Sequence, residues 1–205
     1  MDFAGEDISG RVIGMSFESG HDEDFISSVC VSEKGGKVVS GSTKSIVLWD
    51  FGGVKFSEVF EKNLPIRPMA VVENAHNGTT IWKILIDSSD KHLYSVGQDK
   101  TLKIWDLGVG GQIKFVKSLT GSHDGELYTL GIDSENRRLF TTGLDKKIGV
   151  WNIDKDGGKE AGMPKSQNLI LTCHDRRVWC LAVTKSYVFT GSYDKKVFRW
   201  RFKSP

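Results

Sequence analysis

Tryptophan recurs through this chain at similar intervals, each time in the same kind of setting. Trp49, Trp105, Trp151 and Trp200 each lie near the end of a short run that contains β-branched residues, at spacings of 56, 46 and 49 residues. A histidine precedes each of them by 26 to 29 residues, and these four are His21, His76, His123 and His174. Such a period indicates repeated copies of one small structural unit. The repeat constrains the fold more than any other feature.

Short β-strands are predicted in every unit. The fourth unit is the clearest, with apolar runs at 178–183, 187–190 and 197–201 that are bounded by Gly, Ser, Asp and Lys. A further strand is predicted before each histidine, at 11–17, 68–72, 113–119 and 168–172. No window keeps a helical period long enough to compete. We therefore predict an all-β chain of four units, each with four antiparallel strands.

The ends of these units resemble the Gly-His and Trp-Asp dipeptides of WD repeats. Gly20-His21 and Trp49-Asp50 bound the first unit, and Trp105-Asp106 ends the second. The third and fourth units depart from the pattern, with Trp151-Asn152 and Trp200-Arg201. The resemblance covers residues 11 to 203 and implies a β-propeller, in which one four-stranded sheet forms each blade. It divides the chain into an N-terminal tail (1–10) and a propeller domain (11–205), with repeats at about 19–50, 73–106, 120–152 and 171–202.

The resemblance also implies a hydrogen-bonded tetrad of histidine, hydroxyl, aspartate and tryptophan in each blade. The implied tetrads are His76, Ser95, Asp99 and Trp105; His123, Thr141, Asp145 and Trp151; and His174, Thr190, Asp194 and Trp200. The first unit offers His21, Ser40 and Trp49, but Thr43 stands where the aspartate should be, so its network is expected to be weaker. A buried indole N–H needs an acceptor, and a hydroxyl oxygen supplies one. The same hydroxyl can then donate its own proton to an imidazole nitrogen.

Serine, histidine and aspartate together also suggest a hydrolase triad. Three copies in register, each with its own tryptophan, favour a structural role, because a catalytic site would be unique. Each histidine also has its own aspartate in a separate blade, so the histidines are not expected to converge on one metal ion. We therefore predict no enzyme activity, no metal site and no cofactor.

Composition limits the partners and the cellular compartment that we expect for this chain. The net charge of +2 gives no electrostatic reason to bind nucleic acid or a membrane. No apolar run approaches the roughly 20 residues of a membrane helix, and the acidic N-terminus lacks a hydrophobic signal stretch. Three cysteines (Cys30, Cys173 and Cys180) form no closely spaced pair. They fit a reducing compartment, so we expect an intracellular protein, cytoplasmic or nuclear.

Function in such a fold resides in surface sites. The family resemblance implies a peptide-binding face lined by two recurrent positions beside each tetrad. The first position, just past the start of the innermost strand, is occupied by Ile26, Trp82, Tyr128 and Trp179. The second, just before the turn aspartate, is occupied by Ser42, Gln98, Leu144 and Tyr193. Trp82 and Trp179 are the two tryptophans that the tetrads leave over, and exposed aromatic rings are typical binding hot spots. Alternatively, these rings fill the central channel and pack on each other.

Positive charge gathers on the same predicted face. Arg177 follows Arg176, and lysines follow the turn aspartates at positions 100, 146, 147, 195 and 196. Asp24 and Glu126 offset this charge only in part. An acidic or phosphorylated peptide would suit such a rim. The competing interpretation is that these lysines are ordinary solvated turn residues, and stacking of single-stranded RNA on the rings is a less favoured alternative.

The number of units raises the question of ring closure. The chain begins with a spare outer strand (11–17) and its fourth unit lacks one, so we predict that the N-terminal strand completes the last blade. Four blades are fewer than the resemblance implies, since that family usually builds about seven. Three arrangements remain open: two chains that share one eight-bladed ring, a four-bladed monomer, and a ring that a partner completes or that continues in a longer chain. Exposed strand edges weigh against an isolated open arc.

The sequence thus predicts a non-catalytic scaffold that presents a rigid aromatic, partly basic surface to a peptide or protein partner. The alternative is an architectural subunit of a larger ribonucleoprotein or transport complex. That alternative predicts binding through strand edges or through the insertion at 51–67, which lengthens the first tryptophan spacing.

Overall fold

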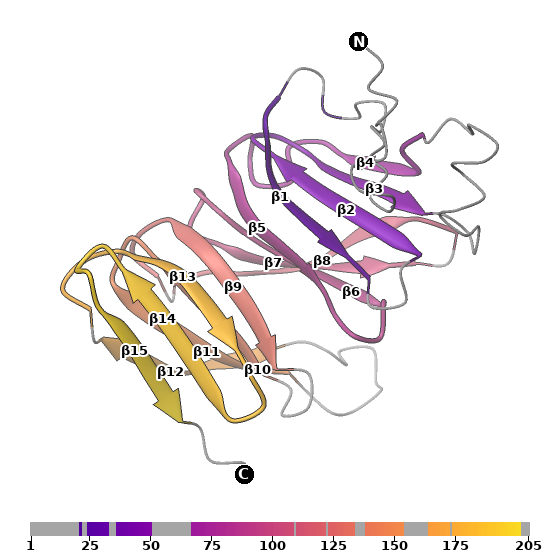
Figure 1. Ribbon diagram of the computed structural model, residues 1–205. Helices are drawn as coiled ribbons and strands as arrows, with labels where there is room; N and C mark the ends of the chain where they lie inside the picture. The colour runs from indigo at the N-terminus through magenta and orange to yellow at the C-terminus, as the bar shows by residue number, and fades with distance from the viewer. Residues whose placement is uncertain are drawn as a thin grey trace, which may run out of the picture.

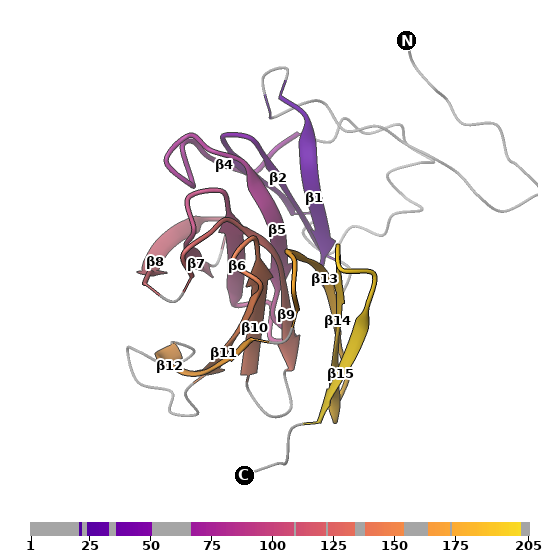
Figure 2. The same cartoon turned by 90° about the vertical axis from the view of Figure 1, so that its left-hand side faces the viewer.

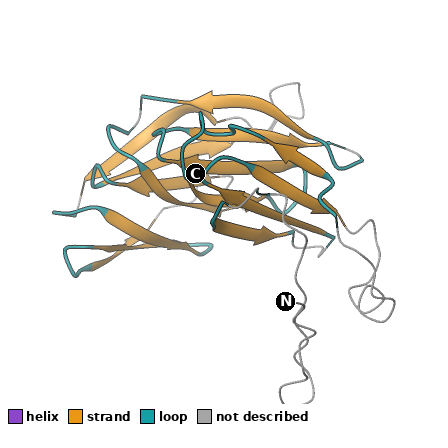
Figure 3. Ribbon diagram, turned by 90° about the horizontal axis from the view of Figure 1, so that it is seen from above, coloured by secondary structure: helices purple, strands orange, loops and turns teal. Residues whose placement is uncertain are grey.

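A computed structural model describes residues 21, 24–32, 36–50, 67–108, 110–121, 123–133, 138–153, 164–172 and 174–201. All regular structure among them is β-strand (Figure 3). The strands form four antiparallel sheets arranged as the blades of a four-bladed β-propeller (Figure 1). The predicted all-β propeller fold is confirmed. The described part of the chain contains no helix long and apolar enough to cross a membrane.

Consecutive strands pair within each blade. The first blade contains β1 (Ile26–Val31), β2 (Lys37–Ser42), β3 (Ile46–Asp50) and β4 (Ala70–Val72). The second contains β5 (Ile81–Ile86), β6 (His92–Gly97), β7 (Leu102–Leu107) and β8 (Ile113–Leu119). The third contains β9 (Leu127–Asp133), β10 (Arg138–Gly143), β11 (Lys147–Ile153) and β12 (Pro164–Thr172). The fourth contains β13 (Val178–Val183), β14 (Tyr187–Ser192) and β15 (Val197–Arg201).

The fourth blade has three described strands, and β15 lies at the edge of this described part of the sheet. The strand expected to complete it, 11–17, lies outside the described residues, as does nearly all of the 51–67 insertion. The first strands of neighbouring blades lie side by side, β1 against β5, β5 against β9 and β9 against β13 (Figures 1 and 2). Among the described residues, no comparable packing joins β13 back to β1. The described blades therefore follow one another along an arc.

One packing rule joins all four blades. In the second, third and fourth blades, the sheet face that carries the tetrad tryptophan packs against the preceding blade. Trp105 packs in a core cluster with Val39 and Leu48 of the first blade, and Trp151 does the same with Tyr94 and Ile104 of the second. Trp200 packs against the cluster that contains Phe140 and Val150 of the third blade. The core is thus three inter-blade layers, which explains why β2, β6 and β10 are buried on both faces.

A β-bulge interrupts the first strand of every blade at the same place. Pairing of β5 with β6 skips Trp82, and pairing of β13 with β14 skips Trp179. In the same way, pairing of β9 with β10 skips Tyr128, and pairing of β1 with β2 skips Ser27. A bulged residue is left out of the ladder, so its side chain is re-aimed away from the sheet. The bulges therefore determine which side chains turn away from the blades.

Candidate functional site

Three blades contain the same four-residue network of hydrogen bonds. In the second blade, the indole Nε1–H of Trp105 donates to Ser95 Oγ at 2.8 Å. His76 lies with Nε2 2.7 Å from that hydroxyl oxygen and Nδ1 2.7 Å from Asp99 Oδ1. The equivalent atoms of the third and fourth blades lie 2.8 to 3.1 Å apart; these residues are His123, Thr141, Asp145 and Trp151, and His174, Thr190, Asp194 and Trp200. The expected tetrads are present.

Burial and hydrogen bonding set the protonation of these groups in the second blade. Burial lowers the pKa of His76, because a charged imidazole would lose its hydration. Burial alone would raise the pKa of Asp99, but the hydrogen bonds from His76 and Thr101 and the charge of Lys103 lower it to about 2. The aspartate is therefore an ionised acceptor that orients a histidine.

The first blade is built differently, and the assignment of Thr43 to the aspartate position is wrong. His21 Nε2 lies 2.5 Å from Ser40 Oγ, as expected, but Nδ1 meets Ser45 Oγ at 2.8 Å. Register explains the exchange. Four residues (42–45) separate the paired positions Gly41 and Ile46, whereas five residues connect the equivalent positions of the other blades. The turn is one residue shorter, so a hydroxyl near its end takes the place of the carboxylate.

The tetrads can support structure but cannot reach a substrate. Ser95, Thr141 and Thr190 have no exposed surface, and each hydroxyl is held between an indole and an imidazole. Each network ties the middle strands of a blade to the turn and to the segment before the first strand. Within the described ranges, no group of three or more His, Cys, Asp or Glu side chains could hold a metal ion.

Three bulged aromatic residues meet across three blades. The ring centroid of Trp82 lies 5.9 Å from that of Tyr128 and 6.4 Å from that of Trp179. Tyr128 and Trp179 are closer, at 4.6 Å. Trp179 nevertheless remains 49% exposed. The rings both pack on each other and form surface, so the two interpretations drawn from the sequence do not exclude one another.

Arg177 connects this group of rings to Tyr193 within the fourth blade. Its guanidinium carbon lies 5.9 Å from the Trp179 ring centroid and 4.3 Å from that of Tyr193. The Tyr193 side chain is 61% exposed. A guanidinium stacked by its face keeps its in-plane N–H groups available to an acceptor. We call Trp82, Tyr128, Trp179, Arg177 and Tyr193 the aromatic–arginine cluster.

The other residues expected on this face fall in different places. Gln98 Nε2 donates to Glu126 Oε1 at 3.5 Å and so joins the second and third blades. Leu144 is 44% exposed. Ile26 is exposed on the first blade, but the register shows that Ser27, not Ile26, is equivalent to Trp82. The Ser27 hydroxyl donates to Gly41 O at 3.0 Å and also bonds Ile81 O, so the ring of aromatic residues does not continue into the first blade.

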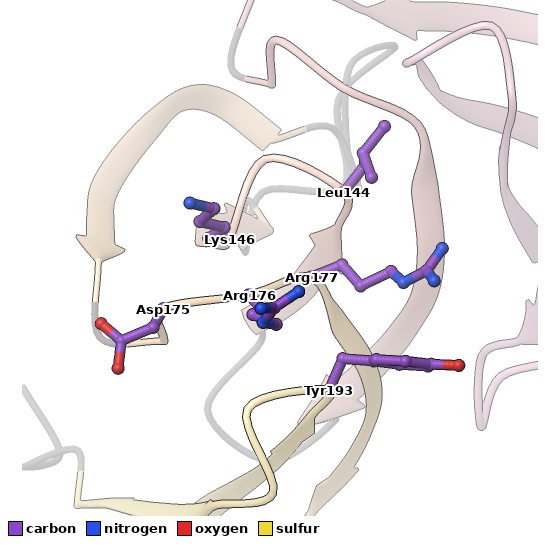
Figure 4. Close-up of a pocket in the computed structure, with 6 residues that line it drawn as sticks. All are labelled: Leu144, Lys146, Asp175, Arg176, Arg177 and Tyr193. Carbon is purple, nitrogen blue, oxygen red and sulfur yellow. The ribbon is translucent and has the colours of Figure 1, made fainter.

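A pocket of about 610 Å³ lies beside Arg177, between the third and fourth blades (Figure 4). The residues that line it are Leu144, Lys146, Asp175, Arg176, Arg177 and Tyr193. Figure 4 shows Arg177 and Tyr193 side by side, with Lys146 and Asp175 on the opposite side. The backbone of the arginine pair is held in place, because the single hydroxyl proton of Ser192 is shared between the carbonyl oxygens of Arg176 and Arg177.

Two of the lysines expected on the rim of this face are paired with aspartates. Lys147 Nζ donates to Asp124, and Lys196 Nζ donates to Asp175 at 3.0 Å. Lys146, which lines the pocket, occupies the left-handed region at φ 67°, as does the equivalent Lys100 of the second blade at φ 65°. Some of the expected rim charge is therefore neutralised locally.

The repeats were also compared with known protein families. The family model described as "WD domain, G-beta repeat" matches residues 14–50, 68–106, 113–152 and 165–201. The chain belongs to the WD-repeat family. WD-repeat propellers are in general non-catalytic scaffolds for protein–protein interaction, which agrees with tetrads that hold blades together. Comparison with curated proteins gave no significant match.

Proposed function

We propose that this WD-repeat protein is a non-catalytic scaffold that binds a peptide or protein partner through the aromatic–arginine cluster. The observation that carries the proposal is the contact of Trp82, Tyr128 and Trp179 across three blades while Trp179 and Tyr193 stay about half exposed. Large rings held by rigid sheets contribute contact area at little entropic cost, so they suit a binding hot spot.

A further feature of Trp82 supports the same surface. Its indole Nε1 is buried, and no acceptor among the described residues meets it. A buried donor without a partner costs free energy. A bound peptide that shifts the rings and offers a carbonyl oxygen to this N–H would recover that cost. The exposed cations beside the cluster favour a partner with acidic groups.

The test is affinity capture from native extract with quantitative mass spectrometry, using the Trp82→Ala/Trp179→Ala double variant. We expect loss of the partners that the wild-type protein captures, with unchanged far-UV circular dichroism. Phe115→Ala is the matched control, since it removes another exposed aromatic ring from the outer strand β8 of the second blade. Unfolding of the double variant would show that the rings are core.

The architectural alternative makes a different prediction. Val197, on β15 at the edge of the described part of the fourth blade, is 75% exposed. Val197→Glu would then abolish capture, while the double tryptophan variant would leave it intact. That pair of results would contradict the proposed binding surface.

A further inference from the structure

We propose that the pocket between the third and fourth blades is the binding site for a phosphorylated side chain of the bound peptide. The inference rests on the proposed function, because the aromatic–arginine cluster lies at the edge of this pocket and would hold the neighbouring part of the peptide. The binding group it assigns shares Arg177 with that cluster and adds two basic residues outside it, Lys146 and Arg176.

Charge in the pocket is unbalanced. Three of its lining residues are cations and one, Asp175, is an anion. Asp175 is already bonded to Lys196 from the turn before β15. No carboxylate among the described residues forms an ion pair with any of the three cations. By contrast, the neighbouring rim lysine Lys147 is paired with Asp124 at 2.5 Å. An anionic ligand would supply the missing counter-charge.

The geometry of Arg177 favours an anion with several acceptor oxygens. Stacking on Tyr193 holds the guanidinium plane, so less conformational entropy is lost when its N–H groups bind. The bonds from Ser192 to the carbonyl oxygens of Arg176 and Arg177 fix where both side chains start. A phosphate monoester carries about −1.5 to −2 charge and three strong acceptor oxygens at neutral pH. It can therefore accept hydrogen bonds from more than one of the cationic groups that line the pocket, whereas a carboxylate offers two oxygens and one charge.

The size and position of the pocket agree with this occupant. Its volume of about 610 Å³ leaves room for a phosphorylated side chain, and Leu144 and Tyr193, which line it, can contact the carbon atoms of such a residue. Because Tyr193 also stacks on Arg177 beside Trp179, one extended peptide can touch the rings and the pocket together.

The experiment measures binding of three degenerate nonapeptide libraries by fluorescence anisotropy. Their central residue is phosphoserine, serine or glutamate. The Lys146→Gln/Arg176→Gln variant removes two pocket cations without touching the rings. Lys100→Gln is the matched control, because Lys100 has the same left-handed turn conformation in the second blade and does not line the pocket. The Trp82→Ala/Trp179→Ala variant tests the proposed function separately.

We expect wild-type protein to bind the phosphoserine library about tenfold or more tightly than the other two. The Lys146→Gln/Arg176→Gln variant should lose this preference, and the Lys100→Gln variant should keep it. Equal binding of the phosphoserine and serine libraries, or of the phosphoserine and glutamate libraries, would overturn the inference. So would competition by inorganic phosphate without any phosphopeptide preference, which would indicate a site for the free anion.

The two proposals fail in different ways. If binding of all three libraries requires Trp82 and Trp179 but the phosphate gives no gain in affinity, the proposed aromatic binding surface is supported and the proposed phosphate site is refuted. If phosphopeptide binding needs the two cations but not the two tryptophans, the phosphate site is supported and the aromatic surface is refuted. Absence of binding to every library would overturn both.

Discussion

Replacement of Trp105 by alanine tests how the blades are held together. Trp105 is 3% exposed, its Nε1–H donates to Ser95 Oγ, and its ring meets Phe115 edge-on at 5.5 Å. Burial of about 200 Å² of aromatic surface at about 25 cal/mol per Å² contributes roughly 5 kcal/mol. Loss of the hydrogen bond adds about 1 kcal/mol, and partial collapse of the cavity recovers some of the total. We expect the free energy of unfolding to fall by about 3–5 kcal/mol.

Trp200 provides an internal comparison. It makes the same bond, from Nε1 to Thr190 Oγ1 at 3.1 Å, but it is only partly buried. Less contact is lost on truncation, so Trp200→Ala should cost about half as much. Trp105→Phe keeps most of the ring and removes the donor, so it should cost about 1–2 kcal/mol.

Urea denaturation followed by far-UV circular dichroism measures all three variants, because tryptophan fluorescence would change with the substitutions themselves. An unchanged dependence on urea concentration would show that the same unfolding transition is compared. A loss below about 1 kcal/mol for Trp105→Ala would refute the structural role of the tetrad. A cost for Trp200→Ala equal to or above that for Trp105→Ala would refute the argument from burial.

Two further predictions concern the polar networks. Ser45→Ala should lower the free energy of unfolding by about 1 kcal/mol, because His21 Nδ1 loses its hydroxyl partner. Lys44→Ala is the control and should leave stability unchanged, because Lys44 is an exposed neighbour of the buried Ser45. Thermal unfolding of both variants measures the difference. Stability should fall on acidification, first below about pH 6.5 and again between about pH 4 and 2. The folded-state pKa values of His76 and Asp99 both lie below their unfolded values, so protons bind the unfolded chain preferentially. Urea denaturation at pH 7, 5 and 3 measures the free energy of unfolding at each pH. A free energy of unfolding that stays constant over this range would contradict the prediction.

The sequence was sufficient for the tetrads because they depend on one-dimensional spacing. Within one blade, the histidine, hydroxyl, aspartate and tryptophan are brought together by two hairpins whose lengths are visible in the chain. Prediction failed where a single residue changed the register. The shorter turn after β2 replaced the expected Thr43 by Ser45. In the first blade the bulged residue follows the histidine by six positions and not by five as in the third and fourth blades, so Ser27 and not Ile26 lies at the bulge. A one-residue shift reverses which side chains face a neighbour, and strand pattern alone does not locate it.

The aromatic rings show the same division. Trp82 and Trp179 could be singled out because the four repeats account for the other tryptophans. Their packing on one another was only one of two interpretations, because the contact with Tyr128 joins three blades and depends on how the first strands of those blades pack. The stacking of Arg177 on Tyr193 has no sequence signal of its own, since the two residues lie in different turns.

By itself, the sequence determined the repeat, the all-β class and the tetrads, because local spacing and hydrophobic pattern encode each blade. Only the tertiary structure decided that three bulged rings and an arginine form one surface, and that Lys146, Arg176 and Arg177 line one pocket beside it. The physical reason is that these groups belong to different blades. Their distances follow from inter-blade packing and from side-chain direction at the bulges, which no single repeat contains.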